Sequence, residues 1–281
     1  MPRFRYVICD VFSDRPLAGN QLAVFTDARE IPEELLQPLA RELNFSETVF
    51  VYPPAADGHV RIRIFTPAVE VPFAGHPTLG SAFVLAGPLQ LVEIRIETGI
   101  GAVPVRVERE GARVTFGWMR QAIPSVEPYD DEPGLLSALG VDGSVMPVEL
   151  YDNGLKTVYV CLRSSEAVAA LEPDLARLSR LPPMLNVYPF AGDGARYRSR
   201  MFSPAGGVPE DPATGSAAGP LAVHLVRHGR IEPGLEIEIS QGVEIGRPST
   251  LYARASGSRE AVERVEVGGR AVIVANGEFE L

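Results

Sequence analysis

The chain has 281 residues, 46% of them hydrophobic and 22% charged, so it can bury one large core or two ordinary ones. Its net charge of −10 repels nucleic-acid backbones and anionic membrane surfaces, and we expect neither as a partner. No apolar stretch approaches the roughly 18 residues of a membrane-spanning helix, and no hydrophobic signal core follows the first residues. We therefore expect a cytoplasmic protein.

Short segments rich in β-branched and aromatic residues predict strands along most of the chain. The predicted strands are 6–9, 49–52, 60–65, 92–97, 103–108, 113–116 and 157–162. Residues 94–108 alternate in character on either side of the segment 98–101 (TGIG). This pattern indicates a hairpin, so the Gly-x-Gly of that segment is a turn and not a phosphate-binding loop.

Helical patterns are fewer and cover residues 32–42 and 166–178. Two further segments, 77–86 and 212–228, begin with proline, end before glycine and carry no charge over most of their length. A helix without a polar face is expected to be buried on all sides. We therefore expect an α+β fold, in which two curved and mostly antiparallel sheets are each rolled around one of these central helices.

One sequence pattern occurs twice, about half the chain apart. Residues 63–68 (RIFTPA) correspond to 200–205 (RMFSPA), and each copy leads to one of the uncharged helix patterns. This spacing predicts two pseudo-symmetric domains and not a solenoid, whose repeats are roughly 20–50 residues long. The expected domains are 1–122 and 123–281, with the last strand, near 270–281, free to pack back on the first domain.

Each copy of the pattern places a different ionisable residue before its helix, His76 in the first and Asp211 in the second. Proline at the next position predicts that both are helix N-caps and lie at positive helix ends. If the two halves face one another, these ends form a carboxylate site, to which Ser216 adds a hydroxyl one turn in. A purely structural capping role for both residues remains the alternative.

Glu47 lies between a predicted helix and a predicted strand, in the segment 44–48 (NFSET). Asn44 and Glu47 match the spacing of a capping box, but the residues that follow favour a strand. A carboxylate beside Phe45 and Phe50 in a closed cleft loses solvation, which raises its pKa toward neutrality. Such a group suits a general acid and base, whereas taken alone Glu47 is an ordinary acid at a strand end.

Four segments resemble, in matching order, the signatures of the PhzF-like isomerases of phenazine biosynthesis. They are 10–20 (DVFSDRPLAGN), 44–48 (NFSET), 72–78 (PFAGHPT) and 211–219 (DPATGSAAG). The resemblance implies the diaminopimelate-epimerase-like fold, a site between two domains and a homodimer. It also implies an isomerase that moves a proton, and with it a double bond, in a small carboxylate such as trans-2,3-dihydro-3-hydroxyanthranilate, without a cofactor.

Carried over residue by residue, the resemblance implies that Glu47 is the catalytic proton shuttle. It implies substrate binding by the other matched positions, Asn20, Gly75, His76, Asp211, Gly215 and Ser216. Relatives of this fold that racemise amino acids use two cysteines in the helix-start loops, whereas Cys9 and Cys161 lie elsewhere. The sequence therefore disfavours a two-thiol racemase and favours one carboxylate that serves as both acid and base.

Two other functional interpretations stay open. Ser216, His76 and Asp211 could form a hydrolase triad, although the sequence around the serine lacks the G-x-S-x-G spacing. The chain could also be a non-catalytic small-molecule binding protein on the same fold. His224 and His228 are four residues apart in a helix pattern, but no H-E-x-x-H accompanies them, so we expect no metal site.

Overall fold

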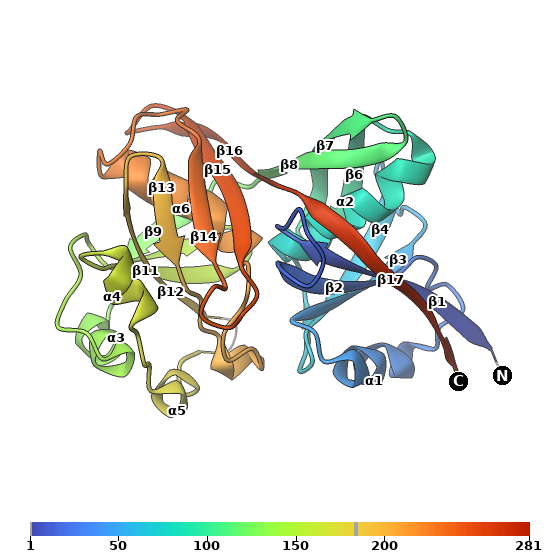
Figure 1. Cartoon of the computed structure of the whole chain (residues 1–281), viewed down its shortest axis with the longest axis horizontal. Coiled ribbons are helices and arrows are strands. Elements are labelled where there is room, and N and C mark those ends of the chain that lie inside the picture. The colour runs from blue at the N-terminus through green and yellow to red at the C-terminus, as the bar shows by residue number, and fades with distance from the viewer. Residues whose placement is uncertain (1, 183–184) are drawn as a thin grey trace. The chain divides into compact units, whose positions relative to one another are not determined.

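The computed structural model describes residues 2–182 and 185–281 (Figure 1). The chain divides into two compact units. Unit 1 consists of Met1–Arg120 and Gly268–Leu281, and unit 2 consists of Gln121–Val267. The chain thus returns to unit 1 at its end, in the segment near 270–281 for which the sequence analysis allowed such packing.

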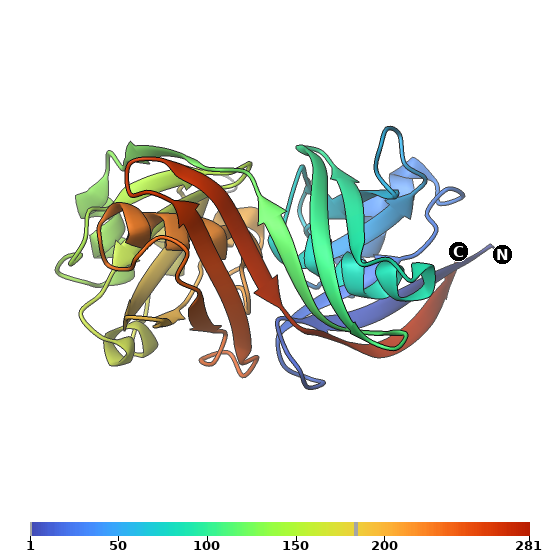
Figure 2. The ribbon, with the colours of Figure 1, turned by 90° about the horizontal axis from the view of Figure 1, so that it is seen from above.

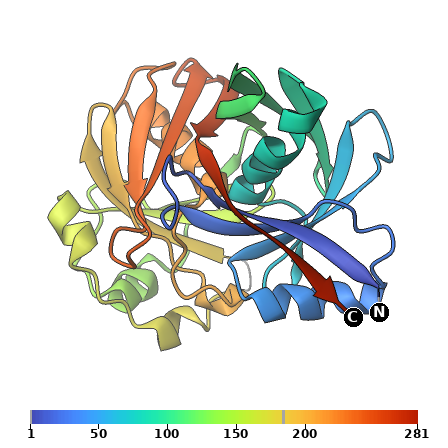
Figure 3. The ribbon, with the colours of Figure 1, turned by 45° about the vertical axis from the view of Figure 1, so that its right-hand side comes forward.

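Unit 1 contains a mostly antiparallel sheet with two parallel pairs, β2–β3 and β4–β6. Its strands are β1 (Arg3–Val11), β2 (Asn20–Phe25), β3 (Glu47–Tyr52), β4 (Val60–Phe65), β5 (Glu70–Val71), β6 (Glu93–Thr98), β7 (Gly101–Glu110), β8 (Arg113–Gln121) and β17 (Ala271–Glu280). The predicted hairpin is confirmed, because β6 pairs with β7 across a turn at Gly99 and Ile100. Antiparallel pairing of β1 with β17 brings the two ends of the chain side by side (Figure 3).

Unit 2 repeats the same succession of strand pairings. Its strands are β9 (Ser125–Pro128), β10 (Glu149–Asp152), β11 (Lys156–Cys161), β12 (Leu185–Asp193), β13 (Arg196–Ser199), β14 (Ile237–Gln241), β15 (Ser249–Gly257) and β16 (Val262–Gly269). From β10 to β15 the pairs alternate between antiparallel and parallel, as they do from β1 to β7. The repeated sequence pattern therefore corresponds to a repeated fold, and the predicted α+β class is confirmed.

Helix α2 (Gly75–Leu89) is the central helix of unit 1 and packs against β1, β2, β6 and β7 (Figure 2). Residues 75–84 are all buried, as the absence of charge predicted. Gly80 permits this close packing, because a Cβ atom there would lie 2.6 Å from Leu22 Cδ2 and 2.7 Å from Val11 Cγ2. The small residues of the first copy therefore let the helix approach the sheet.

Helix α6 (Gly215–Arg227) is the corresponding helix of unit 2 and packs against β15. Every residue from 215 to 226 is buried, so the second uncharged segment also behaves as predicted. The first residue of each helix differs from the predicted one, however. The first starts two residues earlier, and the second starts three residues later, than its proline.

The remaining helices confirm the sequence-based prediction only in part. Helix α1 (Glu33–Leu43) corresponds to the predicted 32–42. The predicted helix 166–178 is wrong, because Pro173 lies between two short helices, α4 (Ser165–Ala169) and α5 (Leu175–Leu178). Helix α3 (Glu132–Leu139) and the 3-10 turn η1 (Pro204–Gly206) were not predicted. No helix within the described ranges is both long and apolar enough to cross a membrane.

Candidate active site

Three of the predicted site residues converge within unit 1. Asn20 and Glu47 are the first residues of β2 and β3. These strands are parallel neighbours, so both residues lie at the same end of the strand pair. The first turn of α2 brings His76 to this end. Nδ1 of His76 lies 3.2 Å from Asn20 Nδ2 and 3.4 Å from Glu47 Oε2. A carboxylate, an imidazole and an amide therefore share one small polar cluster.

This cluster is almost completely shielded from solvent. The side chains of His76 and Glu47 are 3% and 16% exposed, and Asn20 is fully buried. Burial lowers the pKa of His76 to about 3, against an opposing hydrogen bond with the backbone of Gln21. The imidazole is therefore neutral at physiological pH. Within the part of the chain that the structure describes, its buried Nε2 atom has no hydrogen-bond partner, so this atom can bind a ligand.

The predicted N-cap role of His76 is wrong. Ala74, in extended conformation, precedes the helix, and His76 is the second helical residue. Proline is tolerated at the third position because the first four N–H groups of a helix have no intrahelical partner. The Thr78 hydroxyl donates to the Ala74 carbonyl oxygen at 2.8 Å and stabilises this earlier start. His76 and Gly75 nevertheless lie in the first turn.

The predicted site residues of unit 2 gather at the start of α6. Gly215 and Ser216 are its first two residues, and Asp211 lies in the loop before it. The Thr214 hydroxyl donates to Asp211 Oδ2 at 2.7 Å. This contact makes a turn of residues 211–214 and delays the helix, so Asp211 is not the predicted N-cap. Asp211 and Ser216 are 4% and 3% exposed.

Two buried amides that the sequence analysis missed fix the first turn of α6. Gln121 Nε2 donates to the carbonyl oxygen of Gly215 at 2.8 Å, and Asn153 Nδ2 donates to that of Ser216 at 2.9 Å. Neither amide belongs to a motif, so only the folded structure reveals them. They restrain the backbone that carries the Ser216 side chain.

The two cysteines are free and buried, and neither belongs to a helix-start loop, because Cys9 is in β1 and Cys161 is in β11. Burial raises the pKa of Cys161 to about 11 and that of Cys9 further still. A thiol needs its thiolate form to act as a nucleophile or base. Both cysteines are therefore unreactive, which agrees with the sequence-based argument against two-thiol chemistry.

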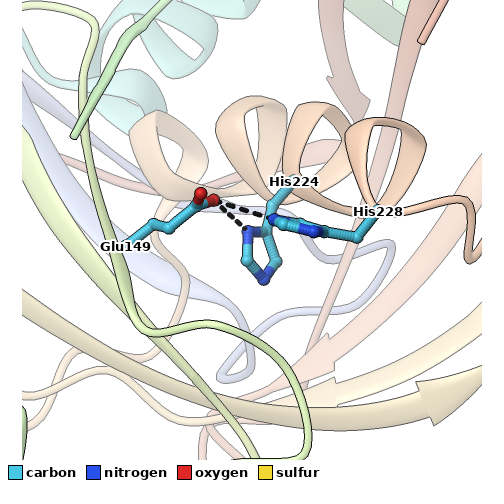
Figure 4. A group of neighbouring side chains, drawn as sticks. All are labelled: Glu149, His224 and His228. Atoms are coloured by element: carbon cyan, nitrogen blue, oxygen red, sulfur yellow. Dashed lines mark hydrogen bonds and ion pairs between the residues drawn. The ribbon is translucent and has the colours of Figure 1, made fainter. Parts of the chain in front are cut away.

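Another polar cluster lies in unit 2, at the C-terminal end of α6. Glu149 Oε2 lies 2.9 Å from His228 Nε2 and 3.2 Å from His224 Nδ1 (Figure 4). The Tyr151 hydroxyl donates to the same oxygen at 2.8 Å, and Arg227 donates to it at 3.3 Å. Burial raises the pKa of Glu149, but these hydrogen bonds and the Arg227 charge outweigh it and lower the pKa to about 2.

Glu149, His224 and His228 offer ligand atoms within 4.8 Å of one another, a spacing that a metal ion could bridge. The guanidinium of Arg227, however, already brings a permanent positive charge to the carboxylate oxygen. A divalent cation at this oxygen would be repelled by it. We therefore interpret the cluster as a hydrogen-bonded anchor that ties the C-terminal end of α6 to β10.

Comparison with known sequences places this geometry in context. The family described as phenazine biosynthesis-like protein (PhzC-PhzF) matches residues 9–277. The chain is 51% identical over 277 residues to trans-2,3-dihydro-3-hydroxyanthranilate isomerase of Pseudomonas aeruginosa, with 99% of each chain covered. It is 49% identical over 276 residues to the enzyme of the same name from Pseudomonas fluorescens, with 98% of this chain and 99% of that one covered.

Solved structures with the same fold agree with this assignment. A PhzF family protein of Bacillus anthracis aligns with a TM-score of 0.86 at 25% identity, covering all of both chains. A predicted epimerase of Pseudomonas aeruginosa gives 0.85 at 31% identity, covering 98% of this chain and 99% of that one. At 12% identity, a hydroxyproline epimerase of Agrobacterium vitis shares the fold alone, with a TM-score of 0.67 over 98% of this chain and 92% of that one. The chain thus belongs to the phenazine biosynthesis-like protein family and is an isomerase with the diaminopimelate-epimerase-like fold.

Proposed function

We propose that the protein isomerises trans-2,3-dihydro-3-hydroxyanthranilate, or a small carboxylate closely similar to it, with Glu47 as general acid and base. The observation that carries this proposal is the convergence of Glu47, His76 and Asn20 in one buried cluster. The identity of 51% to an enzyme named for this reaction supports the substrate class. The proposed reaction needs no cofactor, because proton transfer between carbon atoms requires only a positioned acid and base.

In the proposed mechanism, the Glu47 carboxylate removes a proton from a carbon atom of the substrate. The electron pair of the broken C–H bond moves into the conjugated system and shifts the double bond. The resulting carboxylic acid then gives its proton to a second carbon atom. Glu47 is thereby regenerated, and the substrate has changed only the positions of one proton and one double bond.

The other matched residues are proposed to hold the substrate. In unit 1, His76 would donate or accept a hydrogen bond through its buried Nε2 atom, beside Asn20 and the backbone of Gly75. In unit 2, Asp211 would bind an ammonium or hydroxyl group of the substrate. Ser216 and the N–H groups of the first turn of α6, including Gly215, would bind its carboxylate, because helix N-termini favour anions. We further propose that the enzyme works as a homodimer in the cytoplasm.

The direct test is turnover of trans-2,3-dihydro-3-hydroxyanthranilate by the purified protein and by two variants, Glu47→Gln and Glu34→Gln. Glu34 is an exposed glutamate on α1 and serves as the control for the change of charge. We expect turnover by the wild type and the control and its loss in Glu47→Gln. Stoichiometric labelling of Ser216 by an organophosphate, with ester hydrolysis and no isomerisation, would favour the hydrolase instead.

A further inference from the structure

A fully buried chain of hydrogen bonds ends at the carboxylate of Asp211. It runs through Ser199, Tyr188, Gln241 and Thr214, whose side chains come from β13, β12, the end of β14 and the loop before α6. Ser199, Tyr188 and Gln241 are 0% exposed, and Thr214 is 6% exposed. Buried polar groups of this kind cost stability unless each is satisfied, so their arrangement is closely specified.

Gln241 is the centre of this chain, because all four hydrogen-bonding positions of its amide are used. Its Nε2 atom donates to the Asp211 carbonyl oxygen at 2.8 Å and to Thr214 Oγ1 at 2.9 Å. Its Oε1 atom accepts from the Thr214 backbone N–H at 3.3 Å and from the Tyr188 hydroxyl at 3.0 Å. A primary amide has two N–H donors and two acceptor lone pairs, so the side chain is saturated.

The chemistry of the partners fixes the direction of every hydrogen bond. A backbone carbonyl only accepts and a backbone N–H only donates, so the Gln241 amide can have only one orientation. Thr214 Oγ1 accepts from that amide, and its own proton is therefore directed to Asp211 Oδ2 at 2.7 Å. On the other side, Ser199 Oγ donates to the Tyr188 hydroxyl at 2.8 Å. The side-chain donors of Ser199, Tyr188, Gln241 and Thr214 thus all point along the chain toward Asp211.

We propose that Gln241 is a positioning residue for Asp211, acting through the turn of residues 211–214. It holds that turn at the Asp211 carbonyl and at both the N–H and the hydroxyl of Thr214. The Asp211 carboxylate, which accepts a hydrogen bond from the Thr214 hydroxyl, is thereby held in one orientation. This inference rests on the proposed function, in which Asp211 contacts the substrate. No sequence motif marks Gln241, which lies 30 residues after Asp211.

The decisive experiment is a double-mutant cycle on turnover of trans-2,3-dihydro-3-hydroxyanthranilate with Gln241→Met, Asp211→Asn and the combined variant. Methionine has about the length of glutamine but makes none of the four hydrogen bonds. We expect Gln241→Met to lower kcat/KM about 10- to 100-fold, as misplacement of a binding group does. In the Asp211→Asn background the same change should have little further effect, because the group that it positions has already been altered.

A second pair of variants covers the case in which Gln241→Met does not fold. Thr214→Val keeps the shape of the side chain but removes the hydroxyl that donates to Asp211, whereas Thr214→Ser keeps the hydroxyl. We expect Thr214→Val to reproduce the loss in kcat/KM and Thr214→Ser to retain at least about half of the wild-type value. Circular dichroism and thermal melts of each variant establish that the folded protein is being assayed.

The outcomes separate this inference from the proposed function. If Asp211→Asn lowers kcat/KM but the effect of Gln241→Met is fully additive to it, Gln241 acts on the fold in general and the inference is wrong. If Thr214→Val and Thr214→Ser behave alike, the inference is also wrong. If Asp211→Asn itself leaves kcat/KM unchanged, the proposed substrate contact of Asp211 fails, and the positioning role of Gln241 fails with it.

Discussion

Nδ1 of His76 lies 3.4 Å from Oε2 of Glu47, and the two groups do not form an ion pair at neutral pH. Because burial lowers the pKa of His76 to about 3, its ring is uncharged at neutral pH. A cation at this place would stabilise the carboxylate and weaken it as a base. A neutral imidazole instead gives Glu47 a polar neighbour without a positive charge, as the proposed role of Glu47 as general acid and base requires.

The first prediction concerns the amide that contacts the same imidazole nitrogen. Asn20→Ala removes the side chain that lies 3.2 Å from His76 Nδ1, so the ring loses a restraint on its orientation. We expect kcat to fall about 10-fold, within the usual cost of misplacing a catalytic neighbour. Steady-state kinetics measure this effect. Asn276→Ala, an exposed position on β17, is the control and should leave kcat unchanged. Equal kinetics of the two variants would contradict the role of Asn20.

The second prediction concerns stability in acid. The pKa of His76 is lower in the folded protein, about 3, than its ordinary value of 6.5, so the unfolded chain binds the proton first as pH falls. The free energy of unfolding should therefore decrease below pH 6.5, by about 1.4 kcal/mol per pH unit for one such group. Urea unfolding at pH 6.5, 5.5 and 4.5 measures the slope. His76→Asn should have a smaller slope than the wild type, and an unchanged slope would refute the neutral buried ring.

The third prediction concerns the Glu149 anchor of α6. Glu149→Gln replaces a carboxylate that receives hydrogen bonds from Tyr151, His224, His228 and Arg227. We expect a loss of about 1–3 kcal/mol in the free energy of unfolding at pH 7. Because the pKa of Glu149 is lowered to about 2, its stabilisation is present above pH 4.5 and is lost as pH falls toward 2.

The control for this change is Glu127→Gln, an exposed position on the neighbouring strand β9. It should leave the unfolding free energy within about 0.5 kcal/mol of the wild type. The difference in stability between the wild type and Glu149→Gln should shrink below pH 4.5. A difference that is absent at pH 7, or that grows in acid, would show that the cluster is not an anchor.

The fourth prediction concerns the close approach of α2 to its sheet. Gly80→Ala places a Cβ atom within 2.7 Å of side-chain carbons of Leu22 and Val11, and overpacking of this kind costs about 1–3 kcal/mol. Gly87→Ala lies in the same helix, where the nearest atom to the new Cβ is 3.7 Å away. Because the next residue in the sequence is proline, which disfavours a helical alanine before it, the usual gain of alanine in a helix is not expected, but the change should cost less stability than Gly80→Ala. Thermal melts showing the same effect for both would contradict this packing.

The general fold could be predicted from the sequence, because the features that indicate it are short segments of unusual composition and a pattern that occurs twice. The two uncharged segments predicted buried central helices, and the repeated pattern predicted two similar halves. The helix prediction succeeded because a helix that is buried on all sides must lack charged residues, and this shows directly in the sequence. The predicted helix 166–178 was wrong, because the apolar pattern continues across Pro173, which separates α4 from α5.

The candidate site was predictable only where a motif names its residues. Glu47, His76 and Asn20 lie in such motifs, and the parallel pairing of β2 with β3 brings two of them to one end of that strand pair. The helix starts were misjudged because proline is tolerated at several positions of the first turn. Gln241 was missed for a different reason. Its contacts with the turn of residues 211–214 join segments far apart in the chain, and no local pattern records them.

The central claim is that Glu47 transfers the proton, and isotope exchange in heavy water tests it most directly. The wild type should incorporate deuterium from the solvent into carbon positions of trans-2,3-dihydro-3-hydroxyanthranilate or its product, as seen by mass spectrometry and NMR. Glu47→Gln should bind the substrate with a dissociation constant close to that of the wild type. Both its exchange rate and its turnover should be at least about 100-fold lower. Exchange and turnover at the wild-type rate in Glu47→Gln would contradict the account.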